Sequence, residues 1–142
     1  MPQLQPGDLA FYSGIAAWLI VIGLALARGG GPERWAAALL LANLAIIFVF
    51  PDPTANAVRW RAFVADLVVL GGVLWLCLSF RRGWLVWALG LQMAAVMVHV
   101  PRLLNPAIHN WAYGVLVNLS GYTVITALLA GVILEAPRHA PR

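Results

Sequence analysis

The chain has 142 residues, of which 63% are hydrophobic and 10% are charged, and its mean hydropathy is +0.87. Soluble domains carry about 25% charged residues, and a soluble core of this length could not bury so many apolar side chains. The composition therefore excludes an ordinary soluble domain and predicts an integral membrane protein, with the lipid bilayer as its first partner.

The net charge of +4 comes from nine arginines against five acids, and the chain has no lysine. The arginines lie singly or in pairs between apolar runs, so membrane topology explains them better than a nucleic-acid partner, which we do not expect. The one cysteine, Cys77, lies within an apolar run. An intrachain disulfide is thus excluded, and no spacing typical of metal ligands is present.

Five apolar runs predict five transmembrane helices within a single domain, residues 1–142. The first run, 9–27, should be retained rather than cleaved, because the residues before it have no basic side chain. The second, 35–50, has only about sixteen residues for a hydrocarbon layer of about 30 Å. If this run were only interfacial, four crossings would remain and both termini would lie on one side.

The remaining runs are 62–80, 83–104 and 108–134. We expect Pro101 to loosen the last turn of the fourth helix without preventing it from spanning. The fifth helix, about 40 Å long at helical rise, should be tilted or should emerge into water. Because the connections are short, consecutive helices should be antiparallel. The predicted fold is an all-α, five-helix antiparallel membrane bundle.

The arginines predict the orientation of this bundle. With five crossings, six lie on one side and three on the other, and the side with more positive charge is normally cytoplasmic. This places the N-terminus outside and the C-terminus in the cytoplasm, as in a multi-pass protein of a bacterial inner membrane. The larger set is Arg28, Arg34, Arg81, Arg82, Arg138 and Arg142, and the smaller is Arg59, Arg61 and Arg102.

Small residues at helical spacing are candidate interfaces, because membrane helices approach closely where side chains are small. Such faces would hold the chain's own helices together, or join the chain to a second copy or to a larger membrane complex. The candidate faces are Ser13 with Ala17, Gly23 with Ala27, Ala38 with Ala42, and Gly114 with Asn118 and Gly121.

Asp66 is the only acid well inside an apolar run, and burying a charge in hydrocarbon costs at least about 2.5 kcal/mol. Polar residues of the fourth and fifth runs lie on the same, external side. They predict a polar cavity that could bind a small molecule, a lipid or a proton. Its candidate residues are Asp66, His99, Arg102, His109 and Tyr113 in the walls, Asn43 and Asn118 at the floor, and Gln92, which shares a helix face with His99.

A structural interpretation competes with this site, since Asp66 could form a single ion pair with an arginine and the histidines could be interfacial. No cofactor is predicted outright. A haem would need two axial ligands such as His99 and His109, whereas a quinone head between Asp66, His99 and Tyr113 is sterically easier.

The sequence contains no phosphate-binding loop, metalloprotease motif or serine elbow, so no catalytic residue is predicted and an enzyme is the less favoured class. Three functions remain. The first is a noncatalytic accessory subunit that acts through helix packing, the second is a binding or transport protein that uses the external cavity, and the third is a quinone- or haem-linked redox subunit.

Overall fold

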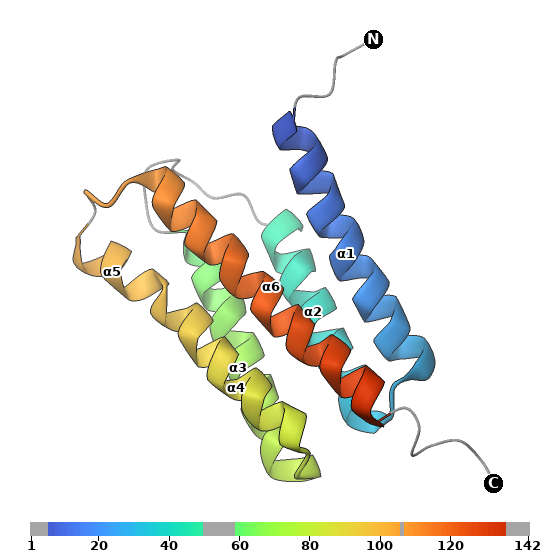
Figure 1. Ribbon diagram of the computed structural model, residues 1–142. Coiled ribbons are helices and arrows are strands. Elements are labelled where there is room, and N and C mark those ends of the chain that lie inside the picture. The colour runs from blue at the N-terminus through green and yellow to red at the C-terminus, as the bar shows by residue number, and fades with distance from the viewer. Residues whose placement is uncertain (1–5, 50–58, 106, 136–142) are drawn as a thin grey trace, which may run out of the picture.

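The computed structural model describes residues 6–49, 59–105 and 107–135, and these residues are almost entirely helical. Figure 1 shows the helices as one bundle. We call the end where α1 begins, at the top of Figure 1, the upper end, and the opposite end the lower end. The helices are α1 (Pro6–Arg28), α2 (Gly31–Val49), α3 (Trp60–Phe80), α4 (Gly83–Met97), α5 (His99–Leu104) and α6 (Asn110–Glu135).

Four helical segments within the described residues are long and apolar enough to cross a membrane, and Tyr12–Arg28 is a shorter apolar helix. The expected number of helical segments is therefore confirmed, with α4 and α5 together forming the fourth. The second segment is longer than expected: α2 has 19 residues and begins at Gly31. The apolar run begins at residue 35, but Pro32 and Glu33 had indicated that the helix itself begins earlier, and Pro32 lies in the first turn, where a missing N–H removes no helical hydrogen bond.

The connection between α3 and α4 consists of Arg81 and Arg82. Arg81 has φ 46° and ψ 42°, which is the left-handed conformation that often ends a helix. Arg82 is extended and precedes the first residue of α4. Two residues suffice to reverse the chain, so α3 and α4 form a tight helical hairpin.

The fourth segment, Gly83–Leu104, has an irregularity at Val98, between α4 and α5, although Val98 keeps helical dihedral angles and its N–H still donates to the carbonyl of Ala94. Pro101 explains the position of this irregularity, because its ring displaces the carbonyl four residues earlier, at Met97, and it has no N–H to donate. We expected only the final turn to loosen. The irregularity instead falls directly before His99, which becomes the first residue of α5.

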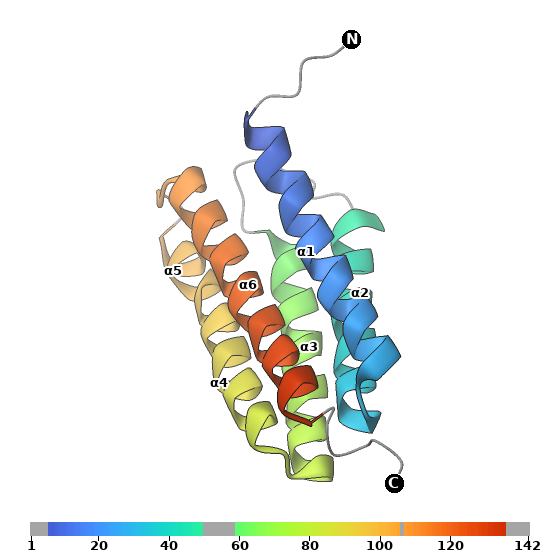
Figure 2. The same ribbon diagram turned by 45° about the vertical axis from the view of Figure 1, so that its right-hand side comes forward.

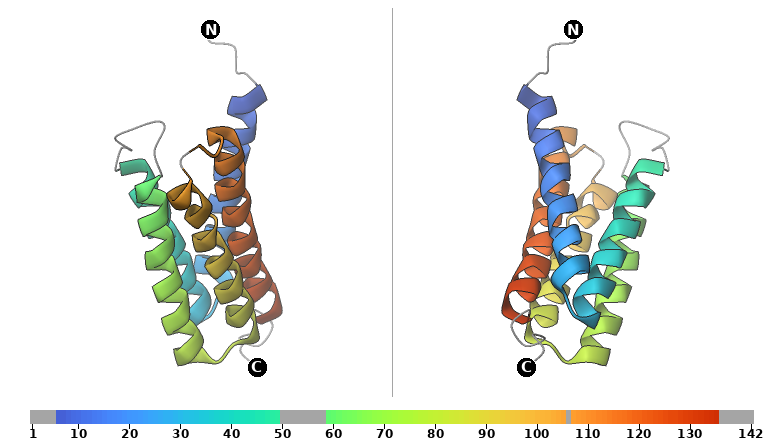
Figure 3. Two further views of the ribbon diagram at one scale, coloured as in Figure 1. Left: turned by 90° about the vertical axis from the view of Figure 1, so that its left-hand side faces the viewer. Right: turned by 90° about the vertical axis from the view of Figure 1, so that its right-hand side faces the viewer.

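Successive helical segments run in opposite directions, with α5 continuing α4, and they surround a common axis (Figures 1 and 2). The closest packing joins α2 to α3, α3 to α4, and α4 to α6, while α1 completes the ring against α2 and α6. The right-hand view of Figure 3 shows α1 in front, between α2 and α6. The upper end therefore carries the first turns of α1, α3 and α6 together with the last turns of α2 and α5.

The apolar core lies toward the lower half of the bundle, where every helix except the short α5 contributes buried side chains. Large apolar residues also cover much of the outer surface, as expected where lipid rather than water surrounds the helices. Core members include Leu40, Val69, Val73, Leu76, Leu85 and Leu128.

Most of the small-residue faces expected to pack the chain's own helices do not do so. Ser13, Ala17, Gly23, Ala27, Ala38 and Ala42 are all exposed on the outside of the bundle. Close approaches occur elsewhere, and the ring of Trp84 lies directly over Gly131, where a Cβ atom would be 2.6 Å from Cδ2 of the tryptophan. Of the candidate faces, only the one on α6 has a buried member, Gly114.

Candidate functional site

Asp66 lies in the second turn of α3 and accepts hydrogen bonds from three other helices. Its Oδ1 is 3.3 Å from Nδ2 of Asn43 on α2 and 3.4 Å from Nε2 of Gln92 on α4. Nε2 of Gln92 also donates to the Asp66 backbone carbonyl, at 3.0 Å. Oδ2 is 3.1 Å from Nε2 of His99 on α5. An acid that would be costly alone in the membrane is thus surrounded by hydrogen-bond partners.

His99 continues this network toward α6. Its Nδ1 lies 2.5 Å from the hydroxyl oxygen of Tyr113, while its Nε2 contacts Asp66. A neutral imidazole has one donor and one acceptor nitrogen. If Asp66 is ionised, Nε2–H donates to the carboxylate and Nδ1 accepts from the Tyr113 hydroxyl. The three side chains then form a continuous hydrogen-bonded chain in which every donor faces an acceptor.

The surroundings of His99 hold its ring in this position. The side chain has 0% exposure, and the ring lies 5.4 Å from Phe63 and 5.6 Å from Tyr113, measured between centroids. Since water cannot replace the partners of a fully buried ring, Asp66 and Tyr113 are its hydrogen-bond partners on either side.

A cavity of about 510 Å³ lies between α1, α2, α3 and α6 in the upper half of the bundle. This volume is within the range of small-molecule sites. Asp66, 17% exposed at its side chain, lines the cavity together with Asn43 and Asn118. The remaining walls are mainly apolar or aromatic and include Ile15, Trp18, Leu44, Ile47 and Phe48.

A second cavity, of about 360 Å³, lies beside α4, α5 and α6. It is lined mostly by apolar side chains, but Arg102 and Tyr113 also border it. The guanidinium of Arg102 is 5.8 Å from the centre of the Tyr113 ring and donates to the amide oxygen of Asn110. Asp66 therefore faces one cavity and Tyr113 the other, with His99 between them.

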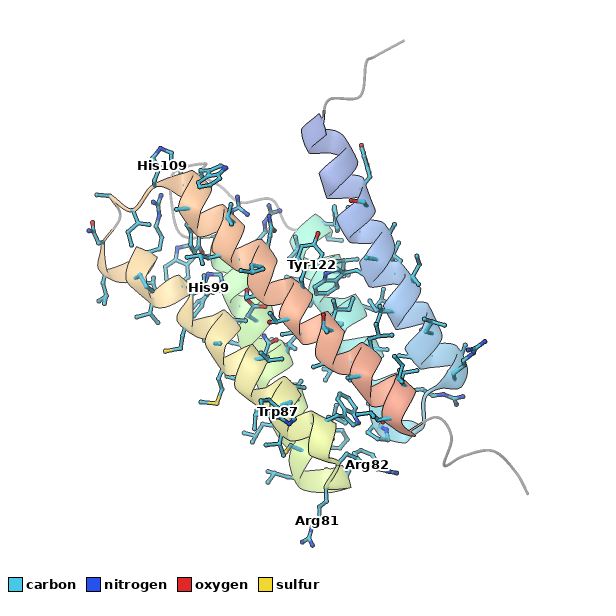
Figure 4. All side chains as sticks on the ribbon, viewed as in Figure 1. Arg81, Arg82, Trp87, His99, His109 and Tyr122 are labelled. Atoms are coloured by element: carbon cyan, nitrogen blue, oxygen red, sulfur yellow. The ribbon has the colours of Figure 1, made fainter. Side chains whose placement is uncertain are left out.

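The structure thus brings together most of the candidate residues, but in two cavities rather than one. His109 is the exception. It is exposed near the connection to α6, where its Nδ1 accepts from the backbone N–H of Trp111. Figure 4 shows His109 at the upper end of the bundle and His99 deeper between the helices.

These positions do not favour a haem ligated by the two histidines. Both ring nitrogens of His99 contact protein groups, and an axial ligand must offer one of them to iron. His109 lies on the exposed surface. A pair of axial ligands would require His99 to leave Asp66 or Tyr113.

Sequence reasoning missed the contribution of α1 to the cavity and that of Tyr122 on α6. Tyr122 reaches from α6 toward α1 (Figure 4), and a Cβ atom at Gly14 would be 2.2 Å from its hydroxyl oxygen. Gly14 therefore leaves space for this hydroxyl beside the cavity, while Trp18 provides an aromatic wall. The only available signal was that Asn118 and Tyr122 are four residues apart and share one helix face.

A second buried acid, Glu33, was also missed because its position in the first turn of α2 indicated an exposed helix start. The residue is only 1% exposed. Its Oε1 accepts from the indole N–H of Trp84, at 3.0 Å. Its Oε2 has no hydrogen-bond partner within the described part of the chain. Glu33 lies at the lower end of the bundle, away from Asp66.

Comparison of the chain with models of protein families, with curated proteins and with solved structures gave no match.

Proposed function

We propose that this chain is a multi-pass membrane protein that binds a small amphipathic molecule in the cavity between α1, α2, α3 and α6. The observation that carries the proposal is the position of the Asp66 carboxylate, which lines an otherwise largely apolar cavity. Ligand sites in proteins typically combine apolar walls with a few fixed polar groups.

The hydrogen-bonding groups indicate the kind of head group that would fit. The network holds Asp66 as an acceptor, and a carboxylate with about four lone-pair positions can accept a further donor. Asn118 also faces the cavity, and its amide can donate and accept. A head group with an amine or hydroxyl therefore suits the site better than one that only accepts, such as a quinone.

The proposed orientation places the cavity in the outer half of the membrane. Arg81 and Arg82 lie at the lower end and Arg59 and Arg61 at the upper end, and the six-to-three distribution of all nine arginines puts the lower end in the cytoplasm. In a bacterial inner membrane, the ligand would enter from the outer leaflet or from the external side.

The first experiment is calorimetric titration of the purified protein in lipid nanodiscs with three probes that share a twelve-carbon chain: an alkylamine, an alkyl alcohol and an alkyl-substituted quinone. The expected order of affinity is amine, then alcohol, then quinone. Val117→Trp should block binding by filling the cavity, whereas Val115→Trp, on the outer surface of the same helix, is the matched control. Equal weak binding of all probes to both variants would contradict the proposal.

A second candidate function, a noncatalytic accessory subunit, is favoured by the exposed small-residue faces of α1 and α2. Gly23 has no atom within 4 Å of a Cβ placed on it, and Ala27, Ala38 and Ala42 are exposed. These faces are available to another membrane helix, from a second copy or from a partner. To test this role, the protein is purified in gentle detergent and its copurifying proteins are compared between two variants. Gly23→Leu blocks the small-residue face, and Leu78→Ala, at an exposed position of α3, is the control. Loss of a stoichiometric partner only from Gly23→Leu supports it.

A further inference from the structure

The two cavities are separated by three hydrogen-bonded side chains. Asp66 lines the first cavity, Tyr113 lines the second, and His99 contacts both residues. The distances are 3.1 Å and 2.5 Å, which are short enough for direct proton transfer between each pair.

From this arrangement we propose that Asp66, His99 and Tyr113 form a proton relay that connects the first cavity with water in the second. The relay would let Asp66 gain or lose a proton while a ligand covers its exposed side. The use of the relay rests on the proposed function, because the relay would couple ligand binding to proton exchange.

The transfer balances with one proton and no change in oxidation state. A hydronium ion in the second cavity gives its proton to the Tyr113 oxygen and becomes water. The original Tyr113 hydroxyl proton moves to Nδ1 of His99, and the proton on Nε2 moves to Oδ2 of Asp66. His99 stays neutral, having exchanged one tautomer for the other. Release of the proton from Asp66 follows the same bonds in reverse.

The groups around the relay suit this transfer. Asn43 and Gln92 contact Asp66 from α2 and α4, and both are neutral. Among the described residues, the charged group facing Tyr113 is the buried guanidinium of Arg102. Its positive charge favours the order in which the Tyr113 hydroxyl proton moves to His99 first, leaving a transient negative charge on the phenol oxygen, which then takes the proton from the second cavity. A water molecule in the second cavity would have two polar partners there, Arg102 and Tyr113.

The relay does not extend along the length of the bundle. Below Asp66 the core is apolar, and the next buried acid, Glu33, is at the lower end and contacts Trp84. We therefore expect proton exchange between the two upper cavities but no proton conduction from end to end.

Protons can reach Asp66 by two routes, directly through the first cavity or through Tyr113 and His99 from the second cavity. The test closes each route separately. In a Cys77→Ser background, Asn118→Cys places a thiol in the first cavity, and N-benzylmaleimide then plugs that cavity. Tyr113→Phe breaks the second route but keeps the aromatic ring. The readout is the infrared carboxyl band of protonated Asp66 after a rapid drop in pH, assigned by its absence in Asp66→Asn.

Plugging alone, or Tyr113→Phe alone, should leave Asp66 protonation fast, because one route remains open in each case. Both changes together should slow it by roughly a hundredfold, a typical size for the loss of a positioned proton-transfer group. Slow protonation in the plugged protein with Tyr113 intact would overturn the relay. So would fast protonation in the plugged Tyr113→Phe protein.

A second measurement leaves Asp66, His99 and Tyr113 unchanged. Nitrogen-15 NMR of labelled histidine in nanodiscs, with His109→Gln and His139→Gln used for assignment, reports the two ring nitrogens of His99. One protonated and one bare nitrogen support the relay. Two protonated nitrogens at neutral pH would indicate a fixed imidazolium–carboxylate pair and overturn it. Neither measurement needs a ligand, so the relay and the binding proposal can fail separately.

Discussion

Nε2 of His99 lies 3.1 Å from Oδ2 of Asp66, although the two residues are 33 positions apart in the chain. The contact joins the first residue of α5 to the second turn of α3. His99 directly follows Val98, where the fourth segment passes from α4 to α5.

The first prediction concerns Asp66. Asp66→Leu removes the acceptor for Asn43, Gln92 and His99, and should destabilise the bundle by about 3 kcal/mol or more. Asp66→Asn keeps a carbonyl oxygen at the same place and should lose much less stability while impairing binding of the alkylamine probe. Thermal unfolding in nanodiscs measures the difference. Equal melting temperatures for the two variants would show that the hydrogen bonds contribute little.

The second prediction separates the two tyrosine hydroxyls. Tyr113→Phe should lower stability by about 1 kcal/mol because the hydroxyl contacts His99 in a buried position. Tyr122→Phe is the matched control, since the Tyr122 side chain is 40% exposed. It should leave the unfolding temperature nearly unchanged. A larger loss from Tyr122→Phe than from Tyr113→Phe would contradict the assignment of the buried network.

The third prediction concerns the buried pair of Glu33 and Trp84. Glu33→Leu leaves the indole N–H without its partner, and Trp84→Phe leaves the carboxyl without its only described donor. Each single change should destabilise the protein, whereas the double variant should lose less than their sum. A coupling of about 1–3 kcal/mol is expected. Strict additivity in the double-mutant cycle would mean that the 3.0 Å contact does not stabilise the fold.

The fourth prediction compares two glycines. Gly131→Ala forces a Cβ atom against the Trp84 ring, and such overpacking costs about 1–3 kcal/mol. Gly23→Ala meets no atom within 4 Å and should be neutral or slightly stabilising, because alanine is the better helix former by about 1 kcal/mol. Unfolding temperatures of both variants, recorded in one lipid, test the packing of α4 against α6.

The number and approximate positions of the helical segments could be predicted because long apolar runs separated by prolines, glycines and arginines are a strong signal. The start of α2 near Pro32 was also predictable, because proline is tolerated in the first turn of a helix. The irregularity at Val98 was not, because Pro101 disturbs the helix several residues before its own position.

The depth of the polar residues was also predictable from their places within the runs, and it correctly grouped Asp66 with His99. Helix rotation was not predictable, because these helices are apolar on nearly all sides and have little amphipathic pattern. For this reason Asn43, Asn118 and Asp66 were expected in one cavity with Tyr113, whereas the structure places Tyr113 in another. Nor could the sequence show which small-residue faces pack inside the bundle, since lipid-facing and helix-facing alanines look alike in sequence.

The two-residue turn at Arg81 and Arg82 has a consequence for biosynthesis in the proposed orientation. With almost no chain between them, α3 and α4 would enter the bilayer as one hairpin in that orientation, with both arginines left on the cytoplasmic side. Asp66 and Gln92 lie on opposite legs of the hairpin and contact each other across it. Asn43 on the preceding α2 also donates to Asp66, so the acid would have donors on both sides of it in the sequence before α6 follows from the ribosome.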